Sequence, residues 1–428
     1  MTPATATMTW FWQAWLAAIV FIFPIPHTIA LRNLLLLIGL LALLATLRRA
    51  PRPSLPAALV PAAWALLATT IWLLLHSFAV APAPTVALDN LRGDWIVPLL
   101  TAVLAAFVTP RAGARRALLA VIAALLAHMF WVFGWQLWLL ATIGPFGNHY
   151  SGIVPFGERD YHSSLNGFLL ALLLAERLAV QSVGSVAALF PARFAWTALA
   201  VSLVADIALR TRNGTIVSVL LIFAATLWMA RRKPRYLLIL LAVMMFGGAS
   251  VALDPRSSGL KESLSIGWNS PSLYWLKSDP ALLPPTATGA KLEYSAYLRG
   301  ALAHQAVQAI AEHPFGLGFG RDGFGRAVEL KYGDKGLVSS HSGWLDFALG
   351  TGLPGLALLL LTAGLAVRGG WRQFRRHDDA AGLMFSFLAG SYLLRCLLDG
   401  HLSGWRLGLF AFLCGVLVAA MKMSPRQT

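Results

Sequence analysis

The stretch SSHSGWLDFALGTGLPG, residues 339–355, joins a long polar segment to an apolar run. Small residues recur after His341 at 7, 11 and 14 positions along the chain. They are Ala348, Gly352 and Gly355, and on a helix they share one face with the histidine. Small side chains allow a neighbouring helix or a lipid chain to approach closely. The stretch predicts a membrane-spanning helix with an imidazole at its entrance. Either the small residues form a packing seam and His341 simply lies at the membrane interface, or His341 is a functional group.

The rest of the chain has the composition of a polytopic membrane protein. Hydrophobic residues make up 58%, charged residues only 12%, and the mean hydropathy is +0.68. A helix needs about 20 apolar residues to cross a bilayer. Twelve runs approach that length, near 8–26, 30–47, 57–80, 94–110, 117–143, 163–181, 194–210, 214–230, 236–252, 342–367, 380–398 and 405–421. We therefore expect an all-α fold with about twelve transmembrane helices.

The basic residues predict the orientation of these helices. The net charge is +16, but Lys and Arg occur in short clusters between apolar runs, so topology explains them better than a nucleic-acid partner. Positively charged loops are retained in the cytoplasm. With both termini cytoplasmic, the inner loops contain most of the basic clusters, for example Arg48 and Arg49, Arg115 and Arg116, and Arg375 and Arg376.

One connection is far longer than the others. Residues 1–252 contain nine expected spans, 253–341 form a loop on the periplasmic side, and 342–428 contain three spans and a cytoplasmic tail. Long loops of ordinary complexity usually carry function. Within this loop, apolar residues at helical spacing over 293–314 predict an amphipathic helix that stops at His313-Pro314.

Charged residues at the outer ends of the expected helices are the first candidates for a site. Arg210 and Arg212 oppose the positive-inside bias, and for Arg210 a snorkelling side chain is as good an interpretation as function. Arg212 is favoured because a tight turn at Asn213-Gly214 would hold it at the membrane mouth. Arg395 and Asp399 are spaced for an i,i+4 ion pair, and Asp399 is also placed to orient an arginine or a histidine.

The second group of candidates lies in the large loop. Arg299 is near the start of the amphipathic helix, which leads into HPFGLGFGRDGFG, residues 313–325. The glycines resemble a nucleotide-binding loop, but no strand precedes them. A turn at Pro314, Gly316 and Gly318 that ends the helix and allows close backbone approach is the simpler interpretation. No metal-ligand spacing occurs, so metal-independent chemistry without a cofactor is favoured.

These residues resemble the bacterial O-antigen ligases of the O-antigen ligase/polymerase superfamily. His341-Ser342, nine residues, Gly352, two residues and Gly355 are similar to the signature of that family. Its other marks have counterparts in Arg212, in Arg299 followed by PFGLGFG, and in Asp399. The twelve spans and the large outer loop agree with the resemblance. O-antigen polymerases and protein O-oligosaccharyltransferases share these motifs.

The resemblance implies an enzyme of the Gram-negative inner membrane with a periplasmic active site. Such ligases transfer a polysaccharide from undecaprenyl diphosphate to a sugar hydroxyl of lipid A–core. His341 would be the general base, since an imidazole with a pKa of about 6.5 suits that role near neutral pH. Arg212, Arg299 and Arg210 would bind the diphosphate. Asp399, Arg395 and Ser342 would support them, and a single displacement would invert the anomeric centre.

A transporter of lipid-linked glycans is the alternative from a different class. Twelve spans alone would suggest it, but transporters usually place their ionisable groups near the bilayer midplane. Here the candidates gather at helix ends and in one loop, which favours the transferase.

Overall fold

The chain is all-helical. Our structure, a computed structural model, describes residues 3–46, 53–143, 154–184, 186–209, 211–231, 233–234, 236–252, 259–269, 273–276, 283, 292–320 and 322–421. Every regular element within these ranges is a helix, and none is a strand. The expected fold class, a polytopic all-α membrane protein, is confirmed.

The apolar helices follow the expected spans closely. They are α1 (Pro3–Ile22), α2 (Ile29–Thr46), η2 with α3 (Ala57–Leu59, Val60–Ala79), α4, η3 and α5 (Pro84–Leu91, Arg92–Ile96, Val97–Ala112), α6 (Ala114–Ile143), α7 (Arg159–Ser182), α8 (Ala192–Ala208), α9 (Arg212–Ala230), α10 (Tyr236–Ala252), α14 (Gly343–His377), α15 (Ala380–Leu398) and α16 (Gly404–Ala420). Within the described residues, eight helices are long and apolar enough to cross a membrane, and α1 and α16 are shorter apolar helices. The remaining two expected spans coincide with α8 and α10, each of 17 residues.

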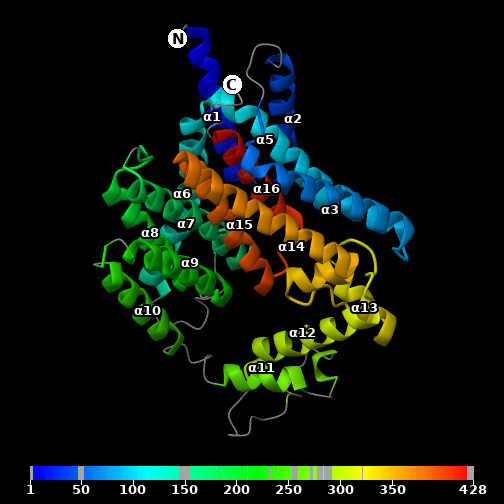
Figure 1. Ribbon diagram of the computed structural model, residues 1–428. Coiled ribbons are helices and arrows are strands. Elements are labelled where there is room, and N and C mark those ends of the chain that lie inside the picture. Colours follow the sequence, from blue (N-terminus) through cyan, green and yellow to red (C-terminus); the bar gives the residue numbers. More distant parts are fainter. Residues whose placement is uncertain are drawn as a thin grey trace.

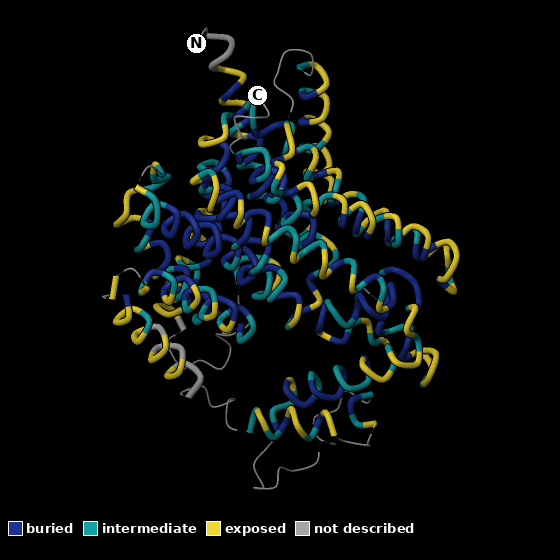
Figure 2. Tube along the Cα trace, viewed as in Figure 1, coloured by how far each residue is buried: buried dark blue, intermediate teal, exposed yellow. Residues whose placement is uncertain are grey.

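The helices surround α7, which is the central element of the bundle. From His162 to Ala179 every residue of α7 except Gly167 is buried. Figure 2 shows buried positions concentrated in this central region, whereas α2 and α3 are exposed along much of their length. Helix α15 packs against α7 on one side and against α14 on the other. This packing brings the outer ends of α7, α9, α14 and α15 together.

The large loop forms a small helical unit at one end of the molecule. Its described helices are α11 (Leu260–Asn269), η5 (Tyr274–Leu276), α12 (Tyr294–Glu312) and α13 (Gly323–Tyr332). Helices α11 and α12 lie at the end opposite to that where α1 begins and α16 ends (Figure 1). We call this end the loop end. The predicted helix is thus present as α12, ending at Glu312, and its apolar residues pack in a second core that includes Tyr297, Phe324 and Leu349.

Helix α14 is not the continuous helix that the sequence predicted. Its backbone breaks at Gly352, where φ is 76° and ψ is 172°. The break lies two residues before Pro354. His341 also lies outside the helix, which starts at Gly343, so a single helical face shared by His341 and the three small residues does not form.

Some expected features lie outside the described residues. Arg210 and the cytoplasmic tail after Met421 are not described, and only parts of the loop at 253–341 are described. Their roles stay predictions.

Candidate active site

Asp399 is the meeting point of the site. It follows the last residue of α15, and its Oδ2 accepts a 2.5 Å hydrogen bond from Nε of Arg395. Its Oδ1 accepts a 2.6 Å bond from Nδ2 of Asn213, at the start of α9. Arg395 also donates from Nη1 to Oγ of Ser163 on α7, at 3.0 Å. One carboxylate therefore joins α15 and α9, and its arginine partner reaches α7.

Arg299 reaches the same carboxylate from the large loop. Its Nη2 lies 3.7 Å from Oδ1 of Asp399, and its Nη1 donates a 2.7 Å bond to the carbonyl oxygen of Leu398. The Arg299 side chain is 35% exposed. Carbonyls at the end of a helix carry partial negative charge, which suits a cation there. The guanidinium is thus anchored on one side and open on the other.

Arg212 lies beside this cluster, although not in the way the sequence predicted. Asn213 and Gly214 belong to the first turn of α9 and form no separate tight turn, so that prediction was wrong. A Cβ on Gly214 would lie 1.8 Å from Oγ of Ser163, so glycine is needed here for close packing of α9 on α7. The Nη1 of Arg212 lies 3.2 Å from Oε2 of Glu293, the residue that caps α12.

His341 lies in a strained, well-supported turn just before α14. Its φ is 62°, which is uncommon for a residue with a side chain. Its backbone N–H donates to Oγ of Ser339 at 3.0 Å, and that hydroxyl donates to Oδ2 of Asp346 at 2.6 Å. The other Asp346 oxygen accepts the Ser340 N–H at 2.8 Å. Strained residues of this kind persist where the surroundings over-determine them, and they cluster at functional sites.

Ser342 has a structural position in the same turn. Its hydroxyl accepts a bond from the Leu345 N–H at 3.5 Å, so it caps the start of α14.

The surroundings of His341 favour its neutral form. Partial shielding of the ring from water lowers its pKa below the ordinary value, and the positive charge of Arg299 lowers it further. The carboxylates of Asp399 and Asp160 oppose this shift. These interactions place the imidazole within electrostatic reach of Arg299 and Asp399, and a neutral imidazole is able to accept a proton.

The glycine-rich turn supports α14 from outside. The Leu353 N–H donates to the carbonyl of Pro314 at 2.8 Å, and the Leu317 N–H donates to that of Leu349 at 2.7 Å. A Cβ on Gly316 would lie 2.4 Å from the backbone nitrogen of Gly352. Both glycines have positive φ, so the turn and the break in α14 fit together only without side chains.

Two further glycines of the expected set have separate contacts. Gly318 presents its carbonyl to Nη2 of Arg326 at 2.7 Å. Gly355 lies against α3, where a Cβ would be 2.9 Å from Nε1 of Trp72. The role predicted for the turn, close backbone approach to the bundle, agrees with these contacts.

Four residues of the site escaped the sequence analysis. Glu293 forms an ion pair with Arg212, and Ser163 accepts a hydrogen bond from Arg395. The Asp160 carboxylate raises the pKa of His341. Asp346 stabilises residues 339–342, which we call the histidine turn. Asp160 and Asp346 carried a usable signal, because an acidic residue in the first turn of an apolar span is a functional candidate by default. Among the described residues, no group of three or more His, Cys, Asp or Glu side chains is placed to hold a metal ion.

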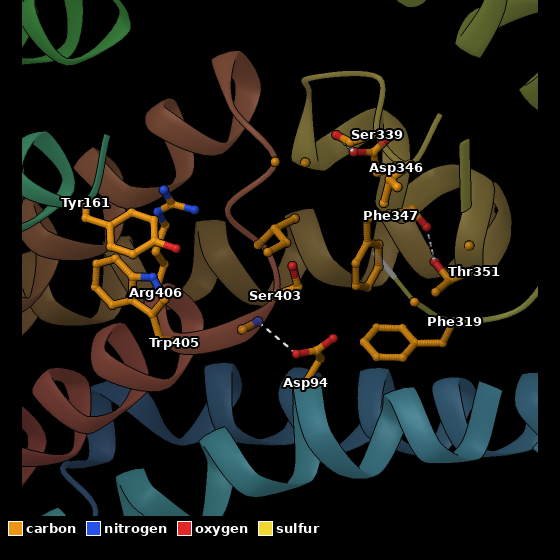
Figure 3. Close-up of a pocket in the computed structure, with 17 residues that line it drawn as sticks. Asp94, Tyr161, Phe319, Ser339, Asp346, Phe347, Thr351, Ser403, Trp405 and Arg406 are labelled. Carbon is orange, nitrogen blue, oxygen red and sulfur yellow. Dashed lines mark hydrogen bonds between the residues drawn. The ribbon is translucent and has the colours of Figure 1, made fainter. Parts of the chain in front are cut away.

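A cavity of about 240 Å³ adjoins the histidine turn. Ser339 and Gly343, two residues either side of His341, belong to its lining, as does Gly400 beside Asp399. Figure 3 shows Asp94 and Ser403 facing this space, with aromatic rings at both ends.

A family comparison adds to the helical membrane fold, over the middle part of the chain. A family model described as O-antigen ligase matches residues 197–360, which run from α8 through the large loop to the break in α14. The matched range contains Arg212, Arg299 and His341, and ends before Asp399. This match supports the O-antigen ligase/polymerase superfamily and, with it, a glycosyltransferase of the ligase or polymerase type. No curated protein matches the chain.

Proposed function

We propose that this protein is a metal-independent, inverting O-antigen ligase. In this proposal it transfers O-antigen polysaccharide from undecaprenyl diphosphate to a sugar hydroxyl of lipid A–core. The observation that carries the proposal is that Arg299 and the segment after His341, which are distant in sequence, both contact Asp399. Arg299 Nη2 lies 3.7 Å from Oδ1 of Asp399, and the Gly343 N–H donates to the Asp399 backbone carbonyl at 3.1 Å. The family match to O-antigen ligase supports the same class of reaction.

The arginines supply what a diphosphate leaving group needs. Negative charge grows on the diphosphate as the glycosidic bond breaks, and fixed cations stabilise it. Arg299 and Arg212 have partly exposed side chains and present planar guanidinium groups, which bind phosphate oxygens in pairs. Their protein partners, Asp399 and Glu293, hold them in place at the mouth of the bundle.

His341 supplies the base. Its neutral imidazole removes the proton from the acceptor hydroxyl as that oxygen forms a bond to the anomeric carbon. The bond from the anomeric carbon to the diphosphate oxygen breaks in the same step, and its electron pair leaves with undecaprenyl diphosphate. One displacement on the face opposite the leaving group inverts the anomeric centre.

The position of the site fits a lipid-bound donor. Helix α12, which carries Arg299, lies at the loop end, away from the start of α1 and the end of α16 (Figure 1). With both termini in the cytoplasm of a Gram-negative cell, this end faces the periplasm, as the positive-inside rule requires. The undecaprenyl chain then remains among membrane lipids while its diphosphate reaches the arginines.

The test is a transfer assay with purified protein, lipid-linked O-antigen and lipid A–core, in detergent and with a chelator. The proposal expects a lengthened lipid A–core, with inverted anomeric configuration, at a rate that the chelator does not change. Longer chains that remain on undecaprenyl diphosphate would identify a polymerase instead. Labelling of a pilin-like protein would identify a protein O-oligosaccharyltransferase, and no covalent product from intact substrates would favour a transporter.

A further inference from the structure

The cavity beside the histidine turn has a lining that differs from the arginine cluster. Neither Arg212 nor Arg299 contributes to it. Its walls come from η3, the start of α7, the glycine-rich turn, the start of α14, and the segment that enters α16. These elements are far apart in sequence, and η3 is a π-helical turn, a feature that is frequent at functional sites.

Polar groups with spare bonding capacity face the cavity from one side. Oδ1 of Asp94 accepts the Gly404 N–H at 2.8 Å, and within the described part of the chain no protein donor contacts its Oδ2 (Figure 3). Ser403 lies next to it in the lining. A carboxylate oxygen and a hydroxyl that line the same cavity suit a ligand that carries several hydroxyl groups.

Aromatic rings close the two ends of the cavity. Phe319 and Phe347 lie at one end, with centroids 6.0 Å apart, and Trp405 and Tyr161 lie at the other, with centroids 5.1 Å apart (Figure 3). Apolar walls with a few placed polar groups are typical of small-molecule sites. A sugar ring has apolar C–H faces and a polar rim, so it matches this arrangement.

The charges in the lining argue against an anionic ligand. Asp94 and Asp346 contribute two carboxylates. The one guanidinium, that of Arg406, lies 4.9 Å from the ring centroid of Tyr161 and is engaged with that ring. A diphosphate is therefore disfavoured here and favoured at the separate arginine cluster.

We propose that this cavity binds the sugar ring of the acceptor that carries the attacking hydroxyl. The inference rests on the proposed function and assigns an acceptor subsite to it. In a single displacement the nucleophile and the leaving group lie on opposite sides of the anomeric carbon. The turn that carries His341 adjoins both regions, because Ser339 and Gly343 on either side of it line the cavity. The Gly343 N–H also donates to the carbonyl of Asp399 at 3.1 Å, beside Arg299.

The cavity is large enough for a sugar ring. Its volume of about 240 Å³ is many times the roughly 10–15 Å³ that a cavity needs to hold one water. Exposed residues at the rim, Val338, Gly400 and Gly404, leave a path for the rest of the acceptor to remain outside.

The experiment compares initial rates of transfer while each substrate is varied in turn. Asp94→Asn keeps an oxygen for the Gly404 N–H but loses the carboxylate, and Ser403→Phe fills the cavity. For Asp94→Asn we expect the KM for lipid A–core to rise about 10-fold, with little change in kcat or in the KM for the donor. Ser403→Phe should raise the acceptor KM further. The matched control is Asp89→Asn, an exposed carboxylate on α4 that does not line the cavity, and it should behave as wild type.

The outcomes separate this inference from the proposed function. If the wild type transfers glycan to lipid A–core but both variants keep its acceptor KM, the subsite is wrong and the ligase activity stands. A rise confined to the donor KM also overturns the acceptor assignment. If the wild type itself makes no such product, the proposed function fails, and the acceptor subsite fails with it.

Discussion

Arg395 and Arg299 both reach Asp399, but from opposite surroundings. The Arg395 side chain is only 7% exposed, and its hydrogen bonds to Asp399 and Ser163 tie α15 to α7. Arg299 is 35% exposed and lies at 3.7 Å from the same carboxylate. Oδ2 of Asp399 thus contacts the buried Arg395, and Oδ1 lies toward the partly exposed Arg299.

The difference separates an inner, structural layer from an outer layer that is available to a ligand. A buried charge that loses its partner is costly, so the Arg395 pair holds the helices in place. A partly exposed pair contributes only about 0–1 kcal/mol. In the proposed function, Arg299 and Arg212 exchange protein contacts for a diphosphate, and their partly exposed pairs make this exchange less costly than loss of the Arg395 pair.

The largest expected effect belongs to the outer layer. His341→Ala should lower the transfer rate about 10²- to 10⁴-fold, because general-base help is lost. His341 itself is exposed, although Ser340 and Ser342 beside it are buried, so the melting temperature in detergent should stay near that of the wild type. A variant that keeps more than half of the wild-type rate would remove His341 as the base.

The inner layer should respond in stability. Arg395→Met breaks a buried ion pair and should lower the free energy of unfolding by about 3–5 kcal/mol. The matched control is Arg92→Met, whose ion pair with Asp89 is 78% and 74% exposed and should contribute at most about 1 kcal/mol. Thermal unfolding in detergent measures both, and equal losses would contradict the division into two layers.

Arg299→Lys is a smaller change within the outer layer. It keeps the charge but loses the planar pair of donors, so transfer should fall roughly 10- to 100-fold. The test is steady-state transfer kinetics, with unfolding temperature as the check that the fold is intact. A wild-type rate would contradict paired binding of phosphate oxygens by this residue.

The smallest expected effect is a shift of the pH profile. The neutral imidazole is the active form, so transfer is lost as pH falls through the pKa of His341. Shielding from water and then Arg299 lower this pKa, so activity should persist below about pH 6.5.

Two variants should move the acid limb of this profile in opposite directions. Arg299→Gln removes the positive charge and should move the acid limb to higher pH. Asp160→Asn removes a carboxylate that raises the pKa and should move the limb to lower pH. The measurement is the profile of kcat/KM from about pH 5 to 8 for the wild type and both variants. Shifts of the acid limb in the same direction for the two variants would contradict the assignment of His341 as the titrating base.

The sequence predicted the elements well where local chemistry decides them. Helix α12 ends one residue before His313-Pro314 because proline cannot continue a helix, and the expected spans fall on helices because apolar length is a local property. The prediction of a tight turn after Arg212 was wrong, because packing of Gly214 against Ser163 keeps that segment in the helix. The continuous face on α14 was wrong because the glycine-rich turn meets the chain at Gly352.

By itself, the sequence determined an all-helical membrane protein and the motif with His341, Arg212 and Arg299. Hydropathy and motif spacing depend only on the order of residues along the chain. Only the tertiary structure decided which charges share one carboxylate and which support the histidine. Glu293, Ser163 and Asp346 take part through contacts between segments that no local pattern connects. The cavity beside His341 belongs to the same category, since Asp94 and Ser403 come to line one space only when η3 packs against the start of α16.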